Sequence, residues 1–266
     1  MARCALDVLR GVESTVVMTA HFQTAVEGEP SAAGSGGRAA AVPGADVVVG
    51  AVRVLGADAL AAYVLTGLPL PGEESAAVRW GLSALPPAQF PAAAPPGGRE
   101  QPWVRAWIDW GLVTVLARLD PAGGCVVAPV PQGPPPCDDA APRRRSVTGP
   151  AVPAGCGSGG EGWVPWSLRM GQLASLALPG LDGPVHQAAR CGAVGLARGA
   201  TRALLRRDFT TAGRITRWLA WLAADHGEPG LDVAALAQDI ALRGGDDRCL
   251  LDAAIARHLL GLEAHV

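Results

Sequence analysis

The sequence predicts a mainly α-helical protein of the α+β class, with a small β-rich N-terminal part followed by a compact helical bundle. Two observations predict this class. Segments rich in β-branched residues occur early in the chain, and from residue 163 onward apolar residues recur with helical spacing between Gly and Pro stops. We expect an N-terminal part at 1–120, a low-complexity insert at 121–162 and a bundle at 163–266, together forming one compact domain.

The expected strands lie at 14–26 and 46–55, which are rich in Val and Thr and are bounded by Gly, Ser and Pro clusters. Residues 57–66 fit a helix or a strand. The segments 27–45 and 86–101 are predicted loops because of their Gly, Pro and Ser content.

A central, buried helix is predicted from Trp103 to Leu119, because apolar residues cover nearly its whole circumference. Its acidic residue is Asp109, and Arg105 lies one helical turn before it. We therefore expect an ion pair between these two side chains.

Five helices are expected after the insert. Polar N-cap residues mark their starts, and Gly or Pro residues mark their ends. The starting signals are Asp182, then Thr210 or Thr211, and then Asp246–Asp247. Short connections between the helices are typical of a bundle. The predicted spans are 166–178, 184–206, 211–225, 232–242 and 247–260.

The second of these helices carries two notable sets of residues. Gly192, Gly195 and Gly199 favour close packing against a neighbour, since Gly costs about 1 kcal/mol in a helix interior relative to Ala. A stripe of arginines is either a solvated face or a surface that meets phosphate, headgroups or an acidic partner. The stripe consists of Arg190, Arg198, Arg202 and Arg206.

Composition restricts the class of protein. All 22 basic residues are arginine, so Lys Schiff-base chemistry and a P-loop lysine are excluded. Neither Lys nor Asn occurs, while Ala, Gly and Pro are abundant, which indicates a GC-rich genome.

The net charge of -2 disfavours polyanion binding. The six scattered cysteines are expected to be reduced thiols. Asp7 and Arg10 disfavour a signal peptide, and we expect no membrane-spanning helix.

Motifs for catalysis and for cofactor or metal binding are weak. Gly155-x-Gly157-x-x-Gly160 matches the dinucleotide fingerprint but follows a linker, not a strand. The histidines do not occur at metal-ligand spacing, and His226 is interpreted as a helix C-cap. Asp138–Asp139 lies in the insert, and Asp246–Asp247 is better explained as an N-cap. We therefore expect no catalytic, cofactor or metal site, and no enzyme.

The predicted partner-binding residues lie on the helix 211–225 and are Ile215, Trp218, Trp221 and Leu222. If Ile215, Trp218 and Leu222 face inward, Trp221 lies near the rim of the bundle. An exposed Trp beside apolar residues is a common interface anchor. Core packing and partner contact both remain open, because a single sequence does not fix the helix phase.

Several segments resemble one family, the alphaherpesvirus tegument proteins known as cytoplasmic envelopment protein 1. The segment Trp107–Leu112, continuing to Leu119-Asp120-Pro121, is similar to the central apolar helix of the family. Tyr63–Thr66 resembles a shorter N-terminal piece. The late helices are similar to those of the family in order and spacing. The residues that carry this similarity are Arg190-Cys191, Phe209 and Trp218, and Trp218 is followed by Leu-Ala-Trp-Leu-Ala-Ala.

This resemblance implies a non-enzymatic tegument adaptor without a cofactor. The implied partner is a palmitoylated tegument protein with ESCRT-III-like helices, and the pair would support cytoplasmic envelopment and egress of virions. The implied locations are the virion tegument, the host cytoplasm and the Golgi or trans-Golgi region, with membrane contact only through the partner. The Pro/Gly/Arg insert and the Ala-rich helix 184–206 depart from the family pattern.

The alternative is a small enzyme or binding protein from a GC-rich bacterium. A pocket that gathers histidine and carboxylate groups would favour the enzyme. An apolar groove on the helical surface would favour the adaptor.

The segment from Pro121 to Gly162 is expected to be dispensable for folding, because its composition cannot bury enough apolar surface to offset the entropy of ordering it. Replacing it with a short Gly/Ser linker should leave the thermal midpoint nearly unchanged. Differential scanning calorimetry would measure this, and loss of a cooperative transition would contradict it.

Overall fold

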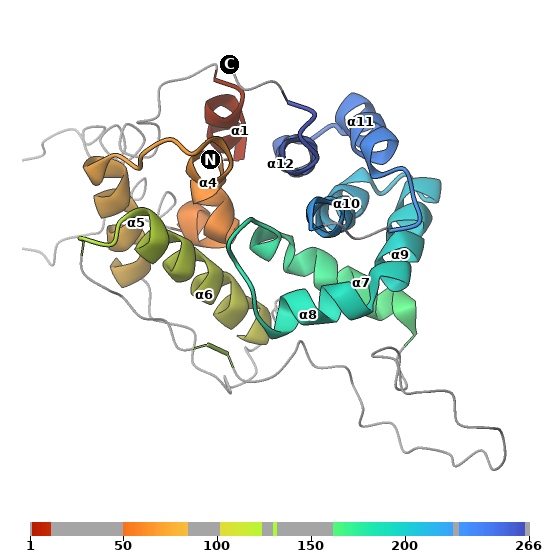
Figure 1. Ribbon diagram of the computed structural model, residues 1–266, viewed down its shortest axis with the longest axis horizontal. Helices are drawn as coiled ribbons and strands as arrows, with labels where there is room; N and C mark the ends of the chain where they lie inside the picture. The colour runs from red at the N-terminus through yellow and green to blue at the C-terminus, as the bar shows by residue number, and fades with distance from the viewer. Residues whose placement is uncertain are drawn as a thin grey trace, which may run out of the picture. The chain divides into compact units, whose positions relative to one another are not determined.

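The computed structural model describes residues 2–11, 50–84, 102–123, 130–131, 162–225 and 229–263. The chain divides into two compact units, residues 1–130 with residue 266, and residues 131–265. The described elements of both units are α-helices and short 3-10 helices (Figure 1). The division at residue 130 falls within the predicted insert, most of which lies outside the described residues.

The first unit is organised around its longest helix, α6, which packs against η1 and α4. The 3-10 helix η1 and the helix α4 also contact α1. The side chains of Ser75 and Arg79 on α5 bind Asp120, directly after α6, and these hydrogen bonds lower the pKa of Asp120. In chain order the described elements are α1 (Ala2–Leu9), a helical segment at 50–55, η1 (Gly56–Leu60), α4 (Ala61–Thr66), α5 (Gly72–Ala84) and α6 (Pro102–Leu119).

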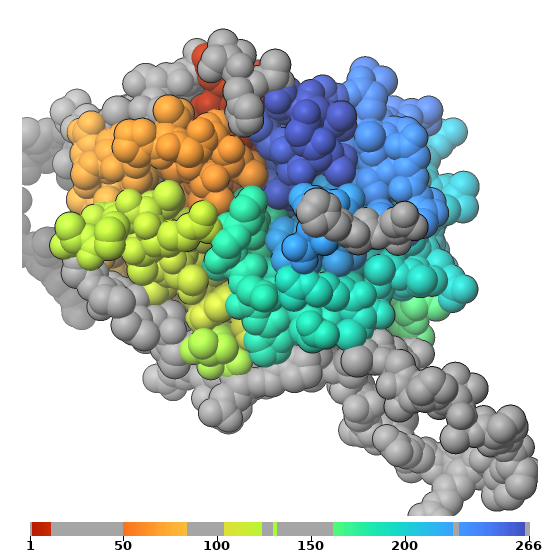
Figure 2. Space-filling model, viewed as in Figure 1, coloured from red at the N-terminus to blue at the C-terminus, as the bar shows by residue number. Residues whose placement is uncertain are grey.

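The second unit is a helical bundle in which α10 is central. Helices α7, α9, α11 and α12 all pack against α10, and Figure 2 shows side chains of α11 and α12 in close contact. The elements are α7 (Trp163–Gln172), η2 (Ala174–Leu176), α8 (Pro184–Cys191), α9 (Ala193–Leu205), α10 (Phe209–Ala224), α11 (Val233–Arg243) and α12 (Asp247–Leu259).

Aspartate side chains begin the last three helices. Asp208, Asp232 and Asp246 each accept a hydrogen bond from the backbone N–H three residues later, which satisfies a donor that has no partner within the helix. The prediction for Asp246 is confirmed. The prediction of Thr210 or Thr211 as the cap of α10 is wrong, because Asp208 takes that position and the helix begins two residues earlier than expected.

The α+β fold class is wrong for the part of the chain that the structure describes, since that part contains no strand. Residues 50–55, in the predicted strand 46–55, are helical, and the other predicted strand, 14–26, lies outside the described residues. Val52 and Leu55 are both buried and lie three positions apart, on one helix face. Their burial outweighs the β-propensity of valine, which is worth at most about 1 kcal/mol.

The expected helix 184–206 is divided into α8 and α9 at Gly192. A Cβ atom at this position would lie 2.1 Å from the indole ring of Trp166 on α7, and one at Gly199 would lie 2.5 Å from Ser167. The glycines therefore permit a close approach of α7 and α9, as their spacing predicted. Arg207, with φ of 57°, turns the chain from α9 into α10.

Asp109 is buried on α6 and its counter-ion is Arg53, not Arg105. Arg53 binds both carboxylate oxygens, with Nε 3.1 Å from Oδ1 and Nη2 2.5 Å from Oδ2. The predicted partner, Arg105, instead donates from Nη1 to the backbone carbonyl of Arg53. Arg53 lies 56 residues before Asp109, so helical spacing could not identify the pair.

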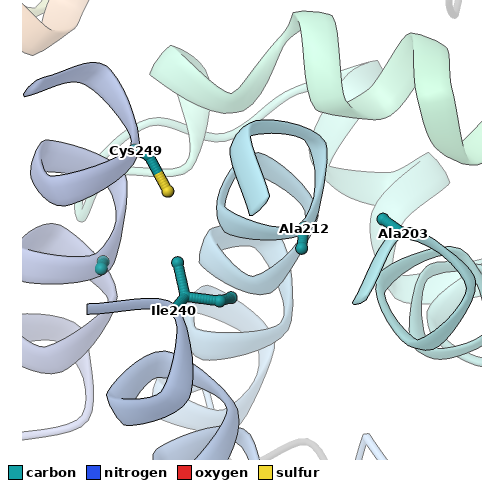
Figure 3. Packing of buried hydrophobic residues seen from close by; sticks show 5 residues of the cluster. Ala203, Ala212, Ile240 and Cys249 are labelled. Carbon is teal, nitrogen blue, oxygen red and sulfur yellow. The ribbon is translucent and has the colours of Figure 1, made fainter. Parts of the chain in front are cut away.

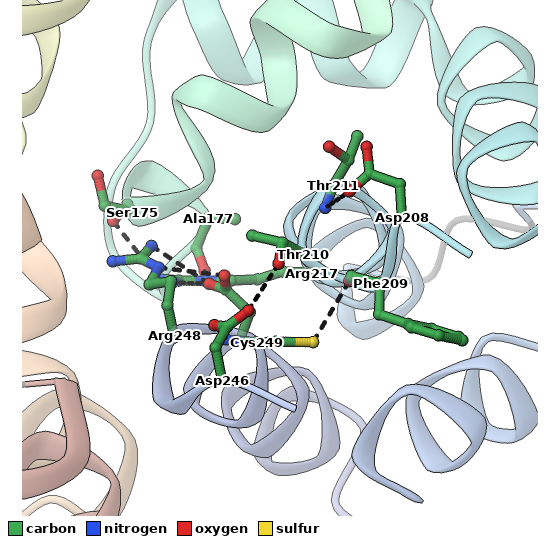
Figure 4. Close-up of polar contacts among 11 residues, drawn as sticks. Ser175, Ala177, Asp208, Phe209, Thr210, Thr211, Arg217, Asp246, Arg248 and Cys249 are labelled. Carbon is green, nitrogen blue, oxygen red and sulfur yellow. Dashed lines mark hydrogen bonds and ion pairs between the residues drawn. The ribbon is translucent and has the colours of Figure 1, made fainter. Parts of the chain in front are cut away.

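A second buried ion pair lies in the middle of the bundle, between Arg217 of α10 and Asp252 of α12 (Figure 4). Both side chains are fully buried, and Nη1 lies 3.2 Å from Oδ1. Arg217 also donates to the carbonyl oxygens of Ala177 and Ser175. Arg248, one turn before Asp252, adds two hydrogen bonds to the same carboxylate. One arginine thus connects α10 to α12 and to the η2 region.

Small side chains fill the space between α9, α10, α11 and α12. The buried cluster there, of which Figure 3 labels four members, consists of Ala203, Ala212, Ile240, Cys249 and Ala253. The Cys249 thiol donates to the carbonyl oxygen of Phe209, and burial raises its pKa to about 11. Cys249 is therefore a packing residue and remains a thiol at neutral pH.

Replacing Arg53 with Met should lower the free energy of unfolding by about 3–5 kcal/mol, as expected when one partner of a buried ion pair is removed. The Arg105→Ala variant is the matched control and should lose much less, because the Arg53–Asp109 pair remains. Urea unfolding followed by circular dichroism measures both. Equal midpoints for Arg53→Met and the parent protein would show that Asp109 does not need this counter-ion.

Candidate functional site

The four predicted partner-binding residues all lie in the core of the bundle. Ile215 and Trp218 are fully buried, Leu222 is nearly so, and Trp221 is 7% exposed. Trp218 donates from its indole N–H to the backbone carbonyl of Met170, at 2.7 Å. Of the two alternatives for Trp221, core packing fits its place in the structure. These residues hold helices together and do not offer a surface to a partner.

The two tryptophans surround a histidine. The ring of His186 on α8 lies 5.4 Å from that of Trp218 and 5.0 Å from that of Trp221, measured between centroids. The two indoles meet edge to face at 5.9 Å. Edge-to-face contacts of this kind add to the stabilisation that comes from buried area alone. The cluster therefore fastens α8 to α10.

Arg190 covers this cluster from the outside. Its guanidinium lies 4.8 Å from the ring centroid of Trp221, a cation–π distance. It also pairs with Asp182 and Asp225, at 2.9 Å and 3.3 Å, and the pKa of Asp182 is lowered mainly by its hydrogen bond from Arg190. Arg190 is thus used within the unit, unlike the other members of the predicted arginine stripe.

His186 is a neutral structural group. Its Nε2 lies 2.9 Å from the carbonyl oxygen of Leu176, which can only accept, so we assign the proton to Nε2. Nδ1 is buried and has no hydrogen-bond partner among the described residues. Burial is the main cause that lowers the pKa of His186, and Arg190 adds to it. The imidazole is therefore uncharged at neutral pH.

An apolar groove lies elsewhere on the bundle, along the outer side of α9. It has a volume of about 480 Å³ and is bordered by Trp163 of α7 and by residues 229–231. From α9 it receives the side chains of Val194, Ala197, Thr201 and Leu205. Their spacing of three or four residues places them on one helix face. Val194 is 64% exposed and Leu205 is 82% exposed, so large apolar side chains here remain in contact with water.

The close packing of α9 on α7 explains why this face points outward. Gly192, Gly195 and Gly199 meet Trp166 or Ser167 of α7 on the inner side of the helix. Leu196 and Ala200 are buried in the unit. The remaining side of the helix carries Val194, Leu205 and the arginines between them.

Two arginines line the groove beside these apolar groups. Arg198 and Arg202 are exposed and lie one helical turn apart on α9. Within the described ranges, neither forms a side-chain hydrogen bond or an ion pair. The arginine stripe signalled this surface in the sequence. Val194 and Leu205 were missed, because in the sequence they cannot be distinguished from core residues of an Ala-rich helix.

The described residues include no cluster of three or more side chains suited to hold a metal ion. Over the same ranges, no helix is long and apolar enough to cross a membrane. The glycine motif at 155–160, the aspartate pair at 138–139 and His226 lie outside the described residues.

The fold and the groove together define a helical bundle with an exposed apolar groove along α9. Comparisons of the chain with protein-family models, with curated proteins and with solved structures found no match. The resemblance to cytoplasmic envelopment protein 1 therefore stays a prediction that rests on the sequence segments quoted for it.

The stability of the protein should fall as the pH drops below about 6.5, the ordinary pKa of histidine. The unfolded chain binds a proton at His186 in that range, whereas the folded protein, in which the pKa is lowered, does not. Through this site the free energy of unfolding falls by at most about 1.4 kcal/mol per pH unit, until the pH drops below the pKa of His186 in the folded protein. Urea unfolding between about pH 7 and pH 5 measures the slope.

His186→Gln should remove this part of the pH dependence, while the control variant His258→Gln should retain it. An unchanged slope in His186→Gln would show that another group takes up the proton.

Proposed function

We propose that this protein is a non-enzymatic adaptor that binds a helix of a partner protein in the groove along α9. The observation that carries the proposal is the groove itself, with Val194 and Leu205 exposed along it. An amphipathic helix in an apolar groove is a recurrent mode of protein recognition. A concave surface with large exposed apolar groups is typical of an interaction site.

The energy available at this site suits a helical ligand. Burying a Leu or Val side chain is worth about 1.5–3 kcal/mol, and two such residues at the ends of the groove would provide anchors along about three turns of a partner helix. Trp163, the first residue of α7, adds a partly buried aromatic side chain to the lining of the groove. We therefore place the anchors at Val194, Leu205 and Trp163, in place of Ile215, Trp218, Trp221 and Leu222.

The resemblance to cytoplasmic envelopment protein 1 suggests the partner of this adaptor and the process in which it acts. We propose that the partner is a palmitoylated tegument protein with ESCRT-III-like helices. The pair would act in cytoplasmic envelopment and egress of virions, in the tegument, the host cytoplasm and the Golgi or trans-Golgi region. Contact with the membrane would come through the lipid of the partner, and the adaptor would need no cofactor.

The enzyme alternative has less support. Among the residues that the structure describes, no histidine and no carboxylate lines the groove. His186 is the described histidine with a lowered pKa, and its ring lies fully buried between two indoles, away from the groove. A general base must reach the proton that it abstracts, and His186 has no such access here.

Val194→Arg combined with Leu205→Arg should weaken partner binding by at least ~30-fold, since losing even one interface anchor costs at least ~2 kcal/mol and this variant loses two. Leu242→Arg is the matched control, because Leu242 is an exposed leucine of α11 outside the groove. Co-precipitation of the palmitoylated tegument partner from co-expressing cells measures the effect.

Equal recovery of the partner by the groove variant and the Leu242 control would contradict the proposal. Failure of the parent chain to bind the tegument partner would favour the bacterial enzyme or binding protein instead.

A further inference from the structure

The outer side of α9 carries cations in a regular row. Arg198, Arg202 and Arg206 are spaced four residues apart, and all three are exposed. Successive members are separated by about 6 Å along the helix axis. The helix itself contains no acidic residue. Of these three, Arg198 and Arg202 line the groove and present positive charge along it.

Five other arginines in the described part of this unit form ion pairs within it. Arg190, Arg217 and Arg248 each pair with an aspartate, and Arg243 and Arg257 pair with Asp239 and Glu263. Among the described residues, by contrast, Arg198 and Arg202 have no hydrogen-bond or ion-pair partner of their own. Both line the groove beside Val194 and Leu205. Within the described part of the unit, arginines without a counter-ion thus border the exposed apolar surface.

We infer that the occupant of the groove is an amphipathic helix with two acidic residues about one turn apart at the edge of its apolar face. This inference rests on the proposed function and names the chemistry of the partner. The apolar residues of that helix would pack on Val194 and Leu205. Its carboxylates would meet the guanidinium groups of Arg198 and Arg202, whose planar fork matches a carboxylate.

The shape of the site favours a protein helix over a membrane surface. The two exposed apolar side chains line an open groove together with Trp163 and residues 229–231, and a helix can lie along such a groove more closely than a flat bilayer can. Helix α9 has 13 residues, a length of about 20 Å. A partner helix of about three to four turns would cover it.

The charges should control selectivity more than total affinity. Arginines at the rim of an interface steer association and disfavour partners of like charge, and their effect weakens as salt is added. An acidic amphipathic helix should therefore bind more tightly than its basic counterpart, with the difference shrinking at high ionic strength.

The test uses the full chain and two labelled helical peptides of about 16 residues. Both carry leucines at positions i, i+3, i+4 and i+7, and they differ only in having two Glu or two Lys residues, four positions apart, beside that face. Fluorescence anisotropy at about 50 mM and about 300 mM salt gives the affinities. We expect the Glu peptide to bind at least ~10-fold more tightly at low salt.

The double variant Arg198→Glu with Arg202→Glu should reverse this preference in favour of the Lys peptide. The charge-matched control is Arg10→Glu with Arg118→Glu, two exposed positions of the first unit, and it should keep the parent preference.

Each other outcome overturns the inference in a distinguishable way. Equal binding of both peptides, still lost in Val194→Arg with Leu205→Arg, would remove the acidic requirement and leave the adaptor proposal standing. The acidic requirement would also be removed, and the adaptor proposal would stand, if neither peptide bound while co-precipitation of the tegument partner was still lost in Val194→Arg with Leu205→Arg. Binding to phosphatidylserine vesicles that requires Arg198 and Arg202, with no peptide binding, would make the row a membrane contact.

Discussion

The bundle that carries the groove depends on the ion pair between Arg217 and Asp252. The two side chains come from α10 and α12 and are fully buried, so each charge would be costly without the other. Arg217 also binds the carbonyl oxygens of Ser175 and Ala177, which fixes the segment after α7 against the central helix. A guanidinium can satisfy three such acceptors at once because its donors point in fixed directions. The pair thereby sets how three elements meet.

Small residues let the other helices approach this centre. Ala203 and Ala212 pack where α9 meets α10, and Gly199 lies against Ser167 of α7. Interiors this closely packed leave little tolerance for added atoms. The inner side of α9 is thus used for packing, while Val194 and Leu205 extend to the outside. The groove is a direct consequence of how α9 is held.

The core and the exposed groove of this unit are formed by different residue types. The aromatic groups Trp218, Trp221 and His186 are used to join α8 to α10. The exposed surface is formed mainly by aliphatic residues and arginines of α9. Aromatic residues are frequent interface anchors in general, and for that reason the tryptophans of α10 were attractive candidates. In this bundle their burial excludes that role, and the candidate binding surface lies on a neighbouring helix.

The sequence by itself determined that the C-terminal half is helical, since apolar periodicity, the cap at Asp246 and the glycine row of α9 are local signals that need no tertiary information. Tertiary structure decided what those signals could not specify. Residues 50–55 are helical because Val52 and Leu55 bury on one face, against the strand propensity of valine. Asp109 is neutralised by Arg53 from far away in the chain. The groove brings together α7, α9 and residues 229–231. Periodicity fixes which residues share a face, but only packing between distant segments decides which face is covered and which charge finds a partner.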